Sequence, residues 1–215
     1  MKRTLTTNLA ILSLLCTPIF IPVSMASEAM LRQFYKDVDT LQANFEQRVS
    51  DETGFSLEDS SGTFSLSRPG KFRWDYVSDD PDLPMGQQII ADGEHIYLFS
   101  PDLDQVTRRS LGDALAQVPS LVLVQSGADI DQHFMISDIG LTDGLSWVAL
   151  KPRDENSSYQ QLLMGFNSGV LEIIELVDGL GNVTRLTLSQ VQSNIKLPKR
   201  RFEFKIPEGA DFLSE

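Results

Sequence analysis

The stretch Ser65–Trp74, SLSRPGKFRW, interrupts a pattern of alternating polar and apolar residues with Arg68-Pro69-Gly70. Proline cannot donate a backbone hydrogen bond to a neighbouring strand, and glycine permits sharp bends. We therefore expect a strand to bend here, as the strands of a strongly curved sheet must. If the register is kept across the bend, one face collects the large apolar side chains of Phe64, Leu66, Phe72, Trp74 and Tyr76.

Most of the remaining chain also alternates with a period of two, which is typical of strands. The pairs Asp92-Gly93 and Asp143-Gly144 predict tight hairpin turns, and Asn167-Ser168-Gly169 predicts a third. A wide antiparallel sheet must curl, so the predicted fold is mainly β with some α, a β-barrel or a half-barrel. About ten strands are expected, including residues 45–49, 63–66, 71–77, 88–91, 95–99, 134–139, 145–150, 159–166, 170–176, 183–191 and 201–206.

Three short helices are predicted to cover the open face of this sheet. From Ser27 onward, apolar residues recur every three or four positions up to Leu41, and Ser27 can cap the helix. Ser110–Asp113 has the form of a capping box, and the apolar residues 114–124 follow it. Pro119 divides this segment, and proline suits the first position of a new helix, so two short helices are expected there.

The apolar faces allow two interpretations. In the segment 95–99, Ile96 and Leu98 point to one side and Tyr97 and Phe99 to the other, and all four are apolar or aromatic. Composition alone favours a large aromatic core. The alternative is a cavity lined by aromatic and aliphatic side chains beneath loosely packed helices.

The N-terminal segment is predicted to be a cleaved signal peptide. Lys2 and Arg3 precede an apolar run that two prolines interrupt, and Ser24-Met25-Ala26 ends it with small residues at the two positions read by the peptidase. We expect residues 1–26 to be removed and residues 27–215 to form one domain. Cys16 is the only cysteine, so the mature chain would have no disulfide. It would keep 16 basic and 30 acidic residues, and its net charge of −14 argues against binding to nucleic acid or anionic membranes.

The sequence contains no pattern typical of an enzyme or of a cofactor site. The only histidines, His95 and His133, have no partner at metal-ligand spacing. No nucleophile elbow, zinc-protease motif or phosphate-binding loop is present. The acidic pairs Asp79-Asp80 and Asp102/Asp104 are interpreted as solvated turns in a strongly acidic chain. We therefore predict a protein that is not an enzyme and holds neither a metal nor a cofactor.

Several motifs in order resemble the periplasmic lipoprotein carriers of the LolA family. They are SLSRPGKFRWDY from Ser65, QQIIADGEHIYLFSPDLDQVTRR from Gln87, the segment around Pro119, DGLGNVT from Asp178, Asn194, and the ending FEFKIPEGAD. The resemblance covers nearly all of the predicted mature chain. It departs from the family in a longer connection, residues 78–86, before the hairpin at Asp92-Gly93.

This resemblance implies an unclosed antiparallel β-barrel (half-barrel) with a hydrophobic cavity beneath a helical lid, and lipoprotein acyl chains as ligand. It implies that an inner-membrane ABC transporter supplies the cargo and an outer-membrane receptor accepts it, with the carrier a monomer in the periplasm. It assigns Arg68 to a latch on the lid backbone and Phe72 to the cavity mouth. The residues expected to line the cavity are Phe64, Leu66, Phe72, Trp74, Ile90, Ile96, Leu98, Leu115, Val118, Leu121 and Val122.

Two alternatives stay open at this level. The chain could be a related half-barrel that senses or receives lipoproteins through their acyl chains without carrying them; the missing acylation cysteine argues against the receptor. Arg68, considered without the family, could equally be a surface residue in a salt bridge. A charged donor that bonds backbone carbonyls at a helix end would instead contribute roughly 1.5–3 kcal/mol per bond, which suits a latch.

Overall fold

The computed structural model describes residues 27–83, 85–111, 119–124 and 130–214. The predicted signal peptide lies outside the described residues. Twelve strands form one sheet in the order β12-β6-β5-β4-β3-β2-β1-β11-β10-β9-β8-β7. Because β12 and β7 stand at its two ends and do not pair with each other, the sheet is open, as predicted.

The elements have the following bounds. The strands are β1 Thr40–Ser50, β2 Ser56–Ser67, β3 Lys71–Tyr76, β4 Gln88–Asp92, β5 His95–Ser100, β6 Gln105–Ser110, β7 Phe134–Thr142, β8 Leu145–Pro152, β9 Tyr159–Asn167, β10 Val170–Asp178, β11 Val183–Ser193 and β12 Asp211–Ser214. The helices are α1 Ser27–Asp37 and α3 Ile130–His133, with 3-10 helices η1 Pro101–Leu103, η2 Pro119–Val124 and η3 Lys199–Phe202.

The break at residues 68–70 is a reversal of the chain and not a bend within one strand, so that part of the prediction is wrong. β2 and β3 pair antiparallel directly across it, with Ser67 opposite Lys71. Gly70 has a φ of +73°, which an L side chain adopts only with strain. The predicted sharing of one face is confirmed, because Phe64 pairs with Trp74 and Leu66 with Phe72. The expected strands 63–66 and 71–77 are therefore separate neighbours that a turn joins, instead of two parts of one bent strand.

The three predicted hairpins are confirmed as β4–β5, β7–β8 and β9–β10. The predicted strand at 201–206 is wrong, because residues 199–202 form η3 and the next residues belong to no strand. Sequence reasoning missed β6 and β12. β12 pairs parallel to β6, and such a contact between distant segments leaves no local turn signal.

The helical lid differs from the prediction. Helix α1 is present with the expected inward face, since Leu31, Phe34 and Tyr35 are buried. The structure describes α1, the short α3 and η2, which begins at Pro119 as predicted, so the lid of about three short helices is not confirmed in full. Residues 112–118 lie outside the described residues. The segment from Pro119 forms the 3-10 helix η2, which suits a six-residue segment better than an α-helix does.

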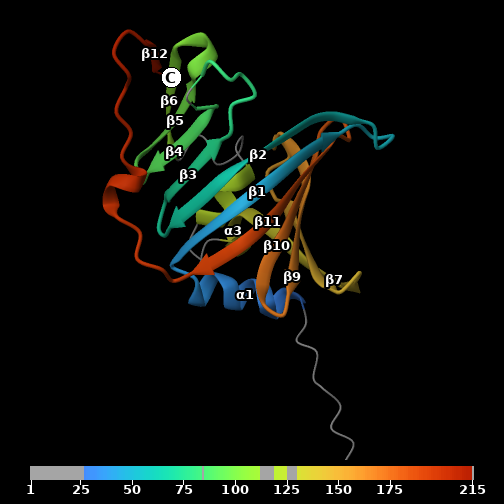
Figure 1. The fold of residues 1–215 in the computed structure, drawn as a ribbon. Coiled ribbons are helices and arrows are strands. Elements are labelled where there is room, and N and C mark those ends of the chain that lie inside the picture. Colours follow the sequence, from blue (N-terminus) through green and yellow to red (C-terminus); the bar gives the residue numbers. More distant parts are fainter. Residues whose placement is uncertain (1–26, 84, 112–118, 125–129, 215) are drawn as a thin grey trace, which may run out of the picture.

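The main core lies on the concave face of the sheet. Figure 1 shows β1, β2, β10 and β11 curving together, with α1 across the base. Helix α1 packs against β7, β8 and β9, and Phe34 meets Phe166 edge to face. The core also contains Val122, Leu123 and Val124 from η2. The segment η2 is therefore a packed part of the interior and not a surface loop.

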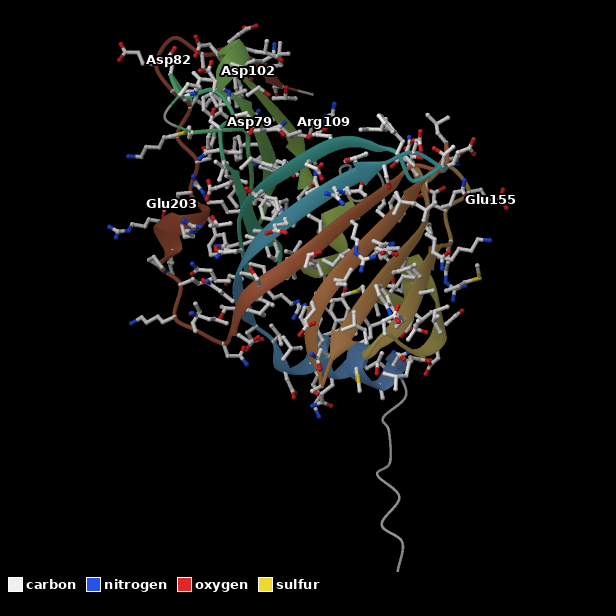
Figure 2. The ribbon with its side chains drawn as sticks, turned by 45° about the vertical axis from the view of Figure 1, so that its right-hand side comes forward. Asp79, Asp82, Asp102, Arg109, Glu155 and Glu203 are labelled. Carbon is white, nitrogen blue, oxygen red and sulfur yellow. The ribbon has the colours of Figure 1, made fainter. Side chains whose placement is uncertain are left out.

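The acidic turn residues are exposed, as predicted. Asp79, Asp80, Asp102 and Asp104 all lie on the surface. Figure 2 shows Asp79, Asp82 and Asp102 gathered at one end of the sheet, far from Glu155. Water can therefore solvate these carboxylates.

Candidate functional site

A cavity of about 270 Å³ lies between η2 and the concave face of the sheet. The strand register explains its position, because alternate residues of neighbouring strands point to the same side. Its wall is mostly apolar and comes from both halves of the sheet. It is lined by Gln47, Trp74, Tyr76, Ile89, Val122, Leu123, Leu162, Ile174, Leu176, Thr184 and Leu186.

The structure places the predicted lining residues in different surroundings. Trp74 and Val122 line the cavity. The other concave-face residues are close to it in register but do not line it: Phe64, Leu66, Phe72 and Ile96 are fully buried in packed core, and Leu98 packs at the edge of that core. Leu115 and Val118 lie outside the described residues, as does the side chain of Leu121. Both original interpretations therefore apply, because a solid aromatic core occupies one half of the sheet and a hollow lies beside it.

Ile90 is corrected by the register. It pairs with Arg73 and Tyr97, whose side chains face away from the cavity, whereas its neighbour Ile89 pairs with Trp74 and lines the cavity. A shift of one residue reverses the face. Because residues 89–91 are all apolar, the sequence held no signal for which of them points inward.

Polar groups are few in the cavity wall. The hydroxyl of Tyr76 donates to Oε1 of Gln47 over 3.2 Å. Burial raises the pKa of Tyr76 to about 12, so this phenol stays neutral and remains a donor. The indole N–H of Trp74 is buried and has no hydrogen-bond acceptor in the part of the chain that the structure describes. A wall of this kind suits a hydrocarbon ligand that carries a few polar atoms.

Arg68 leaves the β2–β3 turn and reaches both covering elements. Its Nε donates to the carbonyl of Leu123 in η2 over 3.0 Å. Its Nη1 donates to the carbonyls of Phe34, over 3.3 Å, and Val38 at the end of α1. The guanidinium also lies 4.7 Å from the ring centroids of Phe34 and Tyr35. Burial lowers the pKa of Arg68 from its usual value, but guanidinium is so basic that it keeps its charge.

Three donors hold the last three carbonyls of η2. The hydroxyl of Tyr35 donates to Val122 over 2.7 Å, Arg68 donates to Leu123, and the backbone N–H of Gly70 donates to Val124 over 3.1 Å. Carbonyls at a helix end have no partner within the helix, so they depend on outside donors. Two of the three donors come from the Arg68-Pro69-Gly70 turn, which therefore joins the sheet to its cover.

Comparison with known proteins identifies the family. The family model described as outer membrane lipoprotein carrier protein LolA matches residues 36–205. The chain belongs to the LolA family. An outer-membrane lipoprotein carrier protein of Methylobacillus flagellatus is 35% identical over 199 residues, 92% of this chain and 94% of the relative.

Further relatives of this LolA-family chain agree with that assignment. A protein of the same name from Alkalilimnicola ehrlichii is 36% identical over 95% of this chain and 93% of its own. Among solved structures, an uncharacterised conserved protein from Thermus thermophilus is similar with a TM-score of 0.54. It is 11% identical, and the match covers 88% of this chain and 99% of that one. This last similarity concerns the fold alone.

In this LolA-family chain the convex face has an apolar cluster of its own. Ile90, Phe99 and Val106 are buried there, and η3, with its buried Phe202, packs against β3 and β4. The ring centroid of Phe204 lies 5.3 Å from that of Tyr97 and 6.0 Å from that of Phe99. The C-terminal segment therefore covers the second apolar side of β4–β6, which explains why the residues of segment 95–99 are apolar on both sides.

An ionic cluster fastens this C-terminal segment to the sheet. Arg201 of η3 bonds Oγ of Ser65 over 3.2 Å and lies 3.3 Å from the carboxylate of Asp75. Asp75 also accepts two bonds from Arg73, at 2.8 and 2.9 Å. Arg201, the last of three consecutive basic residues at 199–201, therefore bonds groups of the sheet. Among the described residues, no helix is long and apolar enough to cross a bilayer, and no group of side chains is placed to hold a metal ion.

Proposed function

We propose that this chain is a periplasmic carrier that shelters the acyl chains of lipoproteins in the cavity beneath η2 and delivers them to the outer membrane. The observation that carries the proposal is an apolar cavity closed by a hydrogen-bonded segment, in a chain that belongs to the LolA family. The relatives named outer-membrane lipoprotein carrier protein support the same role.

The energetics suit a carrier of hydrocarbon chains. Each methylene removed from water contributes about 0.8 kcal/mol, so ten of them contribute roughly 8 kcal/mol. A dry apolar cavity of about 150 Å³ holds one benzene molecule, and by that measure the cavity here holds roughly eleven carbon atoms. A lipoprotein carries more hydrocarbon than that. The cover must therefore open further to admit a complete cargo, and the described state is the closed one.

The three bonds to η2 supply the latch for this opening. In the closed state Tyr35, Arg68 and Gly70 satisfy the carbonyls of η2, which would otherwise need water. A ligand that separates η2 from the sheet breaks these bonds and must offset their free energy. Cargo affinity is thereby reduced by the cost of opening, which favours delivery over permanent retention.

The partners follow from the family role. An inner-membrane ABC transporter would provide the energy for loading, since nothing in the sequence indicates a nucleotide site. An outer-membrane receptor would accept the acyl chains as the cover closes again. The protein would travel between them as a monomer, after removal of residues 1–26.

A pair of neighbouring substitutions tests the cavity. Leu176 lines it, whereas Val177 is the next residue of β10 and points to the opposite face. Both side chains are half-buried. We expect Leu176→Asp to weaken binding of a fluorescent fatty acid at least tenfold, because a carboxylate in the wall must be desolvated by the ligand. Val177→Asp is the matched control and should bind as the unchanged protein does.

The same assay includes the carrier step. Purified lipoprotein should displace the probe from the unchanged protein and then pass to outer-membrane receptor. If the unchanged protein binds no probe, or if both variants lose binding equally while staying folded, the proposed site is wrong.

A further inference from the structure

The N-terminal end of α1 is fastened to the edge of the sheet by one carboxylate. The backbone N–H of Ser27 donates to Oδ2 of Asp138 over 2.9 Å, and the Ser27 hydroxyl donates to Oδ1 over 3.0 Å. Asp138 lies in β7, 111 positions further along the chain. Ser27 is only 2% exposed, although it begins the helix and follows directly on the predicted cleavage site.

We propose that Asp138 receives the N-terminal ammonium group that signal cleavage creates, and that this ion pair anchors the covering helix α1 in the mature protein. Hydrolysis of the Ala26–Ser27 peptide bond adds the hydroxyl of water to the carbonyl of Ala26 and a proton to the nitrogen of Ser27. The released amine takes up a second proton at neutral pH. The nitrogen that donates one neutral N–H in the uncleaved chain thus becomes a cation with three donors.

The geometry already suits a cation. The nitrogen of Ser27 lies 2.9 Å from a carboxylate oxygen, which is the usual distance of a charge-assisted bond between nitrogen and oxygen. Asp138 also accepts the backbone N–H of Gly140 over 2.8 Å, which orients the carboxylate. This arrangement forms at the β-bulge between Asp138 and Gly140, where the edge strand departs from regular pairing.

The ion pair removes a conflict that cleavage would otherwise create. A free ammonium at the start of a helix opposes the helix dipole, whose positive end lies there. The charged groups near this end of α1 are Glu28 and Arg32 on the helix itself and Asp131 on α3. Arg32 is shared between Glu28 and Asp131, with contacts of 2.8 and 2.9 Å. Asp138 is the carboxylate that bonds Ser27 directly.

The anchor stands at the opposite end of α1 from the latch. Arg68 bonds the carbonyl of Val38, just past the C-terminal end of the helix. If the Arg68 contacts break, α1 stays held at Ser27 and by its packing against β7, β8 and β9. The proposal itself does not depend on the nature of the cargo.

The experiment compares two N-termini and two side chains at position 138. One chain is secreted and processed, so that mass analysis reports whether it begins at Ser27 with a free amine. The other begins at Ser27 with an acetylated amine. Each is prepared with Asp138 and with Asp138→Asn, a change that keeps an oxygen for Gly140 and removes only the charge.

We expect Asp138→Asn to lower the melting temperature of the free-amine chain by about 2–4 °C more than that of the acetylated chain. This is the shift that an ion pair contributing up to about 1 kcal/mol produces in a chain of this length. The control Asp143→Asn removes a charge from the exposed β7–β8 turn and should affect both chains alike. An amine-reactive reagent near neutral pH should label the Ser27 amine several-fold faster in Asp138→Asn.

Three results would overturn the proposal. They are a processed chain that begins at another residue, an equal effect of Asp138→Asn on free and acetylated chains, and a labelling rate that Asp138→Asn leaves unchanged. The labelling arm remains decisive if the variants prove too unstable for melting curves.

Discussion

Replacing Arg68 by leucine should shift this protein towards its open state. Leucine cannot donate to the carbonyl of Leu123 in η2 or to the carbonyls of Phe34 and Val38. It keeps an apolar side chain where the methylene groups of Arg68 lie. Tyr35 and Gly70 still hold the other two η2 carbonyls. The cover should therefore loosen and not detach.

The size of the shift follows from the contacts. Among the described residues, the Nε bond is the one that joins Arg68 to η2, and a hydrogen bond from a charged donor contributes roughly 1.5–3 kcal/mol. Because 1.4 kcal/mol is a factor of ten, the ratio of closed to open protein should fall roughly 10- to 150-fold. Arg68 is half-buried and not fully buried, so we expect the lower part of that range.

The assay measures probe affinity and delivery separately. Opening costs less in Arg68→Leu, so the dissociation constant of a fluorescent fatty acid should fall roughly tenfold. Transfer of bound lipoprotein to the receptor should slow, since closing no longer displaces the cargo as strongly. Arg68→Lys is the matched control: it retains a cation without the planar fork and should lie between leucine and arginine.

One result would refute this reasoning. If Arg68→Leu remains folded by circular dichroism, binds the probe with unchanged affinity and delivers cargo at the normal rate, the contacts of Arg68 with the cover are structural and not a latch.

Three further perturbations test separate parts of the structure. Tyr35→Phe removes the hydroxyl bonded to η2, so it should lower the free energy of unfolding in urea by about 1–2 kcal/mol and raise the affinity for the probe. An unchanged free energy of unfolding would show that water replaces the hydroxyl as donor to the buried carbonyl. Ile89→Ala should alter probe binding, because Ile89 lines the cavity. Ile90→Ala, on the convex face, should leave binding intact but lower the free energy of unfolding by about 2–5 kcal/mol. The reverse outcome would contradict the assigned register. The side chain of Asn182 and nearby backbone N–H groups hold the pKa of Asp178 below its usual 3.8. The carboxylate therefore stabilises the β10–β11 turn fully above pH 3.8, and this stabilisation is lost as the pH falls through the lowered pKa. Amide exchange in the turn should speed up on acidification in the unchanged protein but not in Asp178→Asn.

Local residue patterns were sufficient for much of the fold. Alternation with tight-turn pairs such as Asp92-Gly93 predicted the hairpins, because their strands are neighbours in sequence. The spacing of Leu31, Phe34 and Tyr35 predicted the inward face of α1. Segment 95–99 indicated two apolar sides, although not what covers the second one.

Other features depend on contacts between distant segments. The face on which Ile90 lies follows from register against β3 and β5, and three consecutive apolar residues carry no record of that register. The parallel pairing of β12 with β6 and the docking of Arg201 near Asp75 join residues more than a hundred positions apart. The sequence by itself determined a curved antiparallel sheet with an amphipathic helix, since strand and helix periods are local properties. Only the tertiary structure decided where the hollow lies and which groups close it, because a cavity is space left between elements that no single segment specifies.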